Sequence, residues 1–292
     1  MRMDRRRRIY YRRRRQVQRQ MVLLGWSLLL VVGVLSLVLG RKNTAESLAQ
    51  KVVRSGSQKD AEQAKQITIE VEDEEERLER VRKEATEKGY PAGVIELLDK
   101  NEETVEFVEH YEEKKDNPCA ETIDGNWEEG QIPQLYQWDE RWGYAAYGTS
   151  IVAVSGCGPT CMAMVAAGLT NDPSITPAKV AAYGTENEYV DEYNDTYWRF
   201  MKEAGANWNL SCYDGVFTEE QIRDELQAGH PIICSVGPGD FTQNGHFIVL
   251  TQYAEGKVKI NDPFSTKNSS KEWVFAEIAD QIKAMWVYSV NQ

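Results

Sequence analysis

The sequence predicts an α+β domain over residues 119–292, preceded by one transmembrane helix and a helical tether. Two observations carry this prediction. A helical pattern at 158–168 is followed mainly by strand-like apolar runs joined by short turns, an order typical of α+β proteins rather than of alternating βαβ units. Residues 21–40 form a run of twenty residues without a charge, which is the length of a bilayer-spanning helix.

Charge is distributed very unevenly along the chain. The first 42 residues hold 12 of the 34 basic residues and one of the 46 acidic residues. Residues 43–292 therefore carry a net charge of about −23. Because contacts to phosphates need clustered Lys and Arg, this acidic body argues against nucleic acid as a partner. Arginines beside an apolar run favour topology control and anionic lipid headgroups instead.

The N-terminal charges also predict an orientation in the membrane. Basic residues stay on the inner side, so residues 1–20 are a cytoplasmic tail and residues 21–40 a single-pass signal anchor in the cell membrane. The remainder of the chain then lies outside the cell. A cleaved signal peptide is the alternative, although twenty apolar residues exceed the usual signal core.

Two segments separate the predicted anchor from the domain. Residues 41–90 are a charged tether that is partly helical, with a short β-like run at 67–71 and a solvated helix that ends at Gly89. Residues 91–118 are expected to form two short helices, the second capped by Asn101. We expect this helical buttress to pack on the following domain without taking part in chemistry.

From residue 119 onward, aromatic residues and glycines become frequent and the periodicity of apolar residues assigns the elements. Thr218, followed by two glutamates and a glutamine, is a strong helix start. Strands are predicted at 151–154, 232–236, 247–253, 257–260 and 285–290, and helices at 158–168, 176–183, 193–204 and 218–228.

Cys157 lies in a loop punctuated by Gly156, Gly158 and Pro159, directly before an Ala/Met/Val-rich helix. Pro159 suits the first turn of a helix, where its missing N–H costs nothing. Unpaired backbone N–H groups and the positive end of the helix dipole favour a thiolate there. A cysteine in such a place is more often structural than catalytic, so this motif alone leaves both roles open.

Of the three histidines, His246 is the best candidate for a base. His110 lies in a charged helix and His230 precedes a proline, whereas His246 begins an apolar strand, with Gly245 allowing close backbone approach. A turn at Gly256 would join this strand to the next one and bring Asp262 beside His246, as the orienting group that a base needs. The alternatives are a satisfied core histidine and a simple Asn-Asp-Pro turn.

At this point an ordered set of motifs resembles cysteine peptidase family thirty-nine, the bacteriocin-processing, papain-like family, in its stand-alone C39-like branch. The likeness covers about residues 130–290. It implies a papain-like fold, with Cys157 as nucleophile, His246 as general base, Asp262 as its orienter, and Gln137 as oxyanion donor together with the Cys157 backbone N–H. The motifs are Gln137-Trp138-Asp139, GCGPTCMAMV at 156–165, GHPIICSV at 229–236, GHFIVL at 245–250 and NDP at 261–263.

The chain departs from the transporter-linked members of that family in two ways. Gln137 stands twenty residues before Cys157, whereas their glutamine stands only a few residues before the cysteine, so Gln134 is kept as the fallback. The phosphate-binding GxxxxGK[ST] pattern of an exporter ATPase is missing from the sequence. The leader-peptide substrate of those members is therefore not implied here.

The resemblance predicts a cysteine peptidase-type hydrolase that cleaves an amide bond on the outer face of the membrane. Its partner would be a peptide or protein, cell-wall peptide included, with no cofactor and no metal. The alternatives are a non-catalytic surface module that binds peptide or wall fragments, and a cell-wall amidase. Among the other cysteines, Cys161 and Cys234 are expected to be buried packing residues, and Cys119 and Cys212 could pair.

Overall fold

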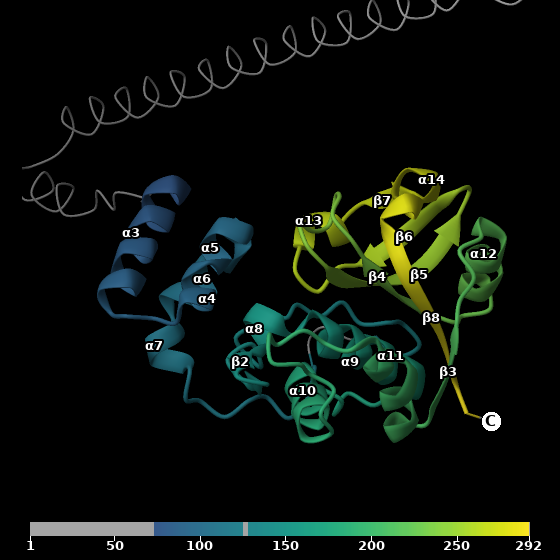
Figure 1. Ribbon diagram of the computed structural model, residues 1–292, viewed down its shortest axis with the longest axis horizontal. Helices are drawn as coiled ribbons and strands as arrows, with labels where there is room; N and C mark the ends of the chain where they lie inside the picture. Colours follow the sequence, from purple (N-terminus) through teal and green to yellow (C-terminus); the bar gives the residue numbers. More distant parts are fainter. Residues whose placement is uncertain (1–72, 125–127, 292) are drawn as a thin grey trace, which may run out of the picture. The chain divides into compact units, whose positions relative to one another are not determined.

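A computed structural model describes residues 73–124 and 128–291 of the chain. Its centre is a six-stranded antiparallel sheet with the strand order β3-β8-β4-β5-β6-β7. One side of the sheet is covered by the helices α8 to α11, and the other by α12 (Figure 1). These helices are α8 (Val152–Ser155), α9 (Cys157–Thr170), α10 (Pro177–Glu186), α11 (Trp198–Glu203) and α12 (Glu219–Gln227). The strands are β3 (Leu210–Asp214), β4 (Ile232–Val236), β5 (His246–Ala254), β6 (Lys257–Asn261), β7 (Glu272–Val274) and β8 (Ile282–Val290).

Alternate side chains of the central strands enter two separate cores. In β5, Phe247 and Val249 pack in the core that contains α9 (Cys157–Thr170), whereas Ile248 and Leu250 pack in the core beneath α12 (Glu219–Gln227). This is the period-two alternation of a pleated strand covered on both faces. Each fully buried aliphatic side chain contributes about 1.5–3 kcal/mol, so the sheet that carries His246 is firmly held.

Helix α9 is the central helix of the domain and is buried from Gly158 to Gly168. Its Ala/Met-rich sequence favours a helix. It begins directly after Gly156 and ends at Asn171, whose φ of 52° is the left-handed conformation that commonly stops a helix. The predicted helix at 158–168 is confirmed, and Cys157 is its first residue. Its neighbours are α8 (Val152–Ser155), α10 (Pro177–Glu186) and α11 (Trp198–Glu203).

A tight hairpin joins β5 to β6. Glu255 and Gly256 both have positive φ, 51° and 80°, as the favoured two-residue hairpin turns require. The register pairs Ala254 with Lys257 and Val249 with Asn261. The beginning of β5 and the end of β6 therefore lie at the same end of the sheet, as the sequence predicts.

The helices before the domain form a third core with it. Val81 of α3, Leu97 of α5 and Phe107 of α6 are buried together with Tyr144 and Ala153 of the domain. Phe107 and Tyr144 stack with ring centroids 4.2 Å apart. The packing predicted for residues 91–118 is thus observed, whereas the prediction that the tether helix, α3, is solvated is wrong, because Val81 and Ala85 are buried in the same core. The segment comprises α3 (Glu74–Glu87), α4 (Ala92–Ile95), α5 (Leu97–Lys100), the 3-10 turn η1 (Glu102–Thr104), α6 (Val105–Glu109) and α7 (Tyr111–Lys114).

Two predicted elements differ in the structure. The run 151–154 is mostly a turn of helix, α8, preceded by the two-residue strands β1 (Ala146–Tyr147) and β2 (Ser150–Ile151). A short buried apolar run has no period that separates strand from helix. The helix predicted at 193–204 begins only at residue 198, because the Asp191 side chain accepts backbone N–H bonds from Tyr193 and Asp195 and holds a turn there.

The remaining short elements complete the description of the chain. They are the 3-10 turns η2 (Ala204–Trp208) and η3 (Ala279–Gln281), with the short helices α13 (Thr266–Ser269) and α14 (Phe275–Ile278). None of the helices in the described parts of the chain is long and apolar enough to cross a membrane. The predicted span at 21–40, the basic tail at 1–20 and the β-like run at 67–71 lie outside the described residues.

Candidate active site

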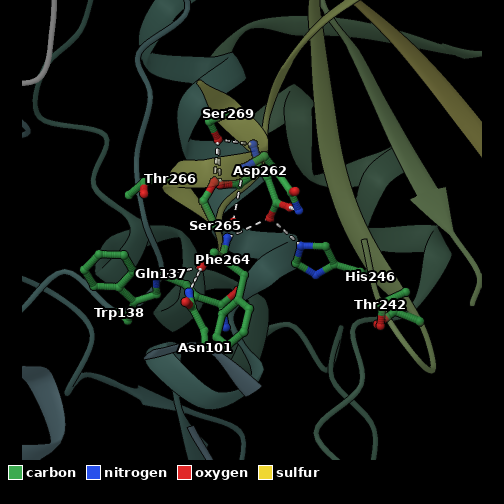
Figure 2. Close-up of polar contacts among 12 residues, drawn as sticks. Asn101, Gln137, Trp138, Thr242, His246, Asp262, Phe264, Ser265, Thr266 and Ser269 are labelled. Atoms are coloured by element: carbon green, nitrogen blue, oxygen red, sulfur yellow. Dashed lines mark hydrogen bonds and ion pairs between the residues drawn. The ribbon is translucent and has the colours of Figure 1, made fainter. Parts of the chain in front are cut away.

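Three of the predicted site residues meet at one end of the sheet. Cys157 is the first residue of α9, His246 is the first residue of β5, and Asp262 directly follows β6. Residues separated by more than a hundred positions are brought together because α9 packs against the face of β5 and the hairpin aligns β5 with β6. Figure 2 shows the imidazole of His246 turned toward Asp262.

The imidazole and the carboxylate form a buried ion pair. His246 Nε2 lies 2.8 Å from Asp262 Oδ1, and the two residues are 9% and 1% exposed. Asp262 also accepts from the Phe264 backbone N–H at 2.9 Å and from Asn268 Nδ2 at 2.8 Å. Burial alone would raise the pKa of this carboxyl, but the charge on His246 and the three hydrogen bonds outweigh it and hold the pKa below its usual value.

The Cys157 thiol lies near enough to His246 to affect the pKa of the imidazole. Because Nε2 is engaged by Asp262, Nδ1 is the ring atom left available to a thiol. Burial by itself lowers the pKa of an imidazole. The charge and hydrogen bond of Asp262, together with the contact to Cys157, overcome burial and raise the pKa of His246 to about 10. A protonated imidazole beside a sulfur favours the thiolate.

Cys157 differs from the other cysteines in its surroundings. It is half-buried at a helix N-terminus, beside an imidazole. Burial raises the thiol pKa of Cys119, Cys161, Cys212 and Cys234, which disfavours their reactive form. All five are free thiols, so the pairing considered for Cys119 and Cys212 is not formed in this structure.

Gln137 is hydrogen-bonded both to the turn before Cys157 and to the loop after Asp262. Its Nε2 donates to the Ala153 carbonyl at 2.8 Å, in the turn before Cys157, and its backbone N–H donates to the Pro263 carbonyl at 2.8 Å. An amide nitrogen carries two hydrogens, so the bond to Ala153 does not exhaust its capacity to donate. Gln137 Oε1 is buried without a hydrogen-bond partner among the described residues. The fallback, Gln134, is instead bonded to the Tyr136 hydroxyl.

The structure adds residues to which the sequence analysis assigns no role at the site. Trp138 donates through Nε1 to the Phe264 carbonyl at 2.9 Å, and the Ser269 hydroxyl accepts the Asp262 backbone N–H at 2.9 Å. The ring of Phe264 meets the ring of His246 edge-on, with centroids 6.4 Å apart. The polar run at 265–270, after Asn-Asp-Pro, is the sequence signal that could have pointed to Ser269. A buried carboxylate needs hydrogen-bond donors close by in the structure.

The other two histidines and Gly245 lie outside this pair of groups. His110 and His230 pair with Glu140 and Glu225, at 2.7 Å and 2.8 Å, away from the pair described above. The role suggested for Gly245 is wrong, because a Cβ placed there would meet nothing within 4 Å. Within residues 73–124 and 128–291, His, Cys, Asp and Glu side chains form no group of three suited to a metal ion.

Part of this chain is similar to a known family and to two solved structures. The model of the family described as Peptidase_C39 like matches residues 130–292. The peptidase domain of Streptococcus ComA, a bifunctional ABC transporter involved in a quorum-sensing pathway, is 18% identical with a TM-score of 0.36, covering 47% of this chain and 93% of that one. A Bacillus anthracis protein described as a C39-like peptidase is 13% identical with a TM-score of 0.36, covering 56% and 96%. A search of curated proteins gives no match.

The family match carries the weight of this comparison, because it extends over more than half of the chain and includes the helix with Cys157, the strand with His246 and the loop with Asp262. It agrees with the α+β architecture of the described residues. The chain belongs to the Peptidase_C39 like family, whose fold is that of papain-like cysteine peptidases.

Proposed function

We propose that this protein is a cysteine peptidase-type hydrolase that cleaves an amide bond with Cys157, His246 and Asp262. The observation that carries the proposal is the buried pair of the Asp262 carboxylate and the His246 imidazole, at the end of the sheet where Cys157 begins α9, in a chain of the Peptidase_C39 like family. A buried, oriented imidazole next to a half-exposed thiol is the arrangement that nucleophilic catalysis needs.

The proposed reaction proceeds in two steps. The thiolate of Cys157 attacks the carbonyl carbon of the substrate, and the C–N bond breaks as the His246 imidazolium gives its proton to the leaving amine. The product is a thioester with Cys157. Water, deprotonated by His246, then attacks the thioester carbonyl and restores the thiolate and the imidazolium. Asp262 stays ionised throughout and holds the imidazole in place.

The tetrahedral intermediates of both steps carry a negative oxygen. We propose that the Cys157 backbone N–H and the Gln137 amide donate to it. As the first residue of α9, Cys157 has an N–H without an intrahelical acceptor. Gln137 Nε2 is held beside the preceding turn by Ala153. Such donors are worth about 2.7–4 kcal/mol of transition-state stabilisation each.

The first test asks whether Cys157 is activated. The full-length chain, purified in detergent, is alkylated with iodoacetamide at about pH 6, where an ordinary thiol is almost fully protonated, and the labelled site is mapped by mass spectrometry. We expect Cys157 to react faster than the same peptide in the unfolded chain, and faster than Cys119. Labelling of Cys157 no faster than the unfolded peptide would show that no activated nucleophile exists.

The second test addresses the substrate. Cleavage of a peptide library and release of fragments from purified wall material are compared for the wild type and for Cys157→Ala. Loss of peptide cleavage in the variant supports a peptidase, whereas release from wall material alone supports the amidase alternative. A variant that retains the full activity of the protein in its host would favour the non-catalytic binding module.

A further inference from the structure

The helical segment before the domain reaches the loop that carries Asp262. Asn101, which ends α5, donates through Nδ2 to the Phe264 carbonyl at 2.5 Å. Glu103, in η1, accepts the Thr266 backbone N–H at 2.9 Å and is also bonded to the Thr266 hydroxyl. These contacts join residues 163 positions apart in the chain. Figure 2 shows Asn101 beside Phe264, on the loop that follows Asp262.

The loop positions held by this segment are the ones that support the carboxylate. The N–H of Phe264 donates to Asp262 Oδ1, the same oxygen that faces His246. Thr266 begins the short helix α13, from which Asn268 donates to Asp262 Oδ2 at 2.8 Å. Both oxygens of the carboxylate therefore accept hydrogen bonds from residues at or near the positions that the helical segment holds. These donors are Phe264 itself and Asn268, which lies two residues after Thr266.

The two attachment residues are themselves fixed. Asn101 Oδ1 accepts the Glu103 backbone N–H at 3.0 Å and caps η1, while its Nδ2 also lies 3.1 Å from Glu103 Oε2. Thr104, directly after them, is fully buried, and its hydroxyl donates to the Asn101 carbonyl at 2.7 Å. Side chains locked in this way can hold the loop without a large loss of conformational freedom.

We propose that Asn101 and Glu103 are positioning residues for the active site, holding the loop at residues 262–269 so that Asp262 stays aligned on His246. The inference rests on the proposed function, and it gives the segment at 91–118 a part in the chemistry that packing alone does not require. Neither residue touches the reacting atoms. They act through the Phe264 and Thr266 backbone on the carboxylate.

The test uses variants that separate positioning from folding. Asn101→Asp keeps the oxygen that caps η1 but replaces the donor to Phe264 with a second oxygen, and Glu103→Ala removes the acceptor for Thr266. Glu102→Gln, at an exposed neighbour in the same turn, is the matched control. Each full-length variant is alkylated with iodoacetamide across a pH series, the rate at Cys157 is measured, and the midpoint of thermal unfolding is recorded.

A loosened loop leaves the imidazolium less stabilised, so the thiolate forms at higher pH. For Asn101→Asp and Glu103→Ala we expect alkylation of Cys157 at about pH 6 to fall roughly tenfold and the profile to move up by about one pH unit. Glu103→Gln, which retains one acceptor, should recover part of the rate. A purely structural role would lower the unfolding midpoint without moving the pH profile.

Two other outcomes overturn the inference in distinguishable ways. If the wild-type thiol is activated and both variants follow the control profile, the positioning role is wrong and the proposed function stands. If the wild-type thiol itself labels no faster than the unfolded peptide, both proposals fall together. Should Asn101→Asp not fold, Glu103→Ala decides, because it removes the acceptor of the Thr266 backbone N–H, and an unchanged pH profile there contradicts the proposal.

Discussion

At the scale of single residues, the carboxylate of Asp262 is the group on which the site depends. It is 1% exposed and accepts three hydrogen bonds, one of them from His246. A buried charge without partners would be strongly unfavourable, so the carboxylate and the imidazolium require each other. The Cys157 thiol adds to the rise in the pKa of the same imidazole. Removing the negative charge at residue 262 should therefore change the reactivity of the Cys157 thiol.

Asp262→Asn tests this coupling. An amide can still accept from His246 but no longer stabilises its positive charge, so the pKa of His246 should fall from about 10 toward its ordinary value. We expect alkylation of Cys157 by iodoacetamide at about pH 6 to slow by about tenfold or more. Asp280→Asn, which removes the same charge from an exposed position, serves as the control. Equal rates in both variants would contradict the coupling.

The pH dependence of stability should carry the signature of His246. Its pKa is raised on folding to about 10, so the stabilisation is complete below the unfolded value of about 6.5 and is lost as the pH rises toward 10. We expect the Tm difference between the wild type and His246→Gln to shrink over that window by on the order of 10 °C. Thermal unfolding at a series of pH values measures it, and His230→Gln controls for loss of a histidine.

At the scale of elements, the sequence locates Cys157, His246 and Asp262 because each of these candidate residues stands at an end marked by turn residues. Gly156 precedes the helix of Cys157, and Gly256 fixes the hairpin that aligns His246 with Asp262. Such signals are local and can be read without a structure. The helix start at Cys157 and the strands β5 and β6 are accordingly confirmed within a residue or two.

The contacts that hold the Asp262 loop could not be predicted in the same way. Asn101 and Trp138 reach the Phe264 carbonyl across 163 and 126 positions of sequence, and no local pattern records such a pairing. Asn101 is already explained locally as a helix cap, which conceals its second role. The turn at 191–195 was missed because its polar side chains replace helical hydrogen bonds without interrupting the apolar spacing.

Close packing at the start of α9 gives a prediction for this element. A Cβ on Gly158 would lie 2.6 Å from Thr196 Oγ1 and 2.9 Å from Thr196 Cβ, and that hydroxyl is bonded to Tyr147. Gly158→Ala should therefore force the neighbouring segment away and cost about 1–3 kcal/mol, seen as a lower Tm. Gly245→Ala, where the Cβ meets open space, is the matched control next to His246. Equal midpoints for the two variants would contradict this account.

At the scale of the whole molecule, the described part of the chain consists of a helical segment and a peptidase-like domain that share a core. Phe264 packs against that core with its ring while its backbone holds Asp262, so the same residue joins the helices to the site. This contact is the structural basis of the positioning role proposed for the segment. How the protein meets its substrate depends in addition on where the chain is held in the cell.

We propose that residues 21–40 anchor the protein in the cell membrane with the domain outside, because the basic residues precede the apolar run and an acidic body follows it. The full-length chain produced in a bacterial host should sediment with membranes and resist carbonate extraction, whereas a chain lacking residues 1–42 should not. Protease added to intact spheroplasts should remove the domain, with a cytoplasmic protein as the control for lysis. A domain protected until the cells are lysed would place it on the inner side and contradict the predicted orientation.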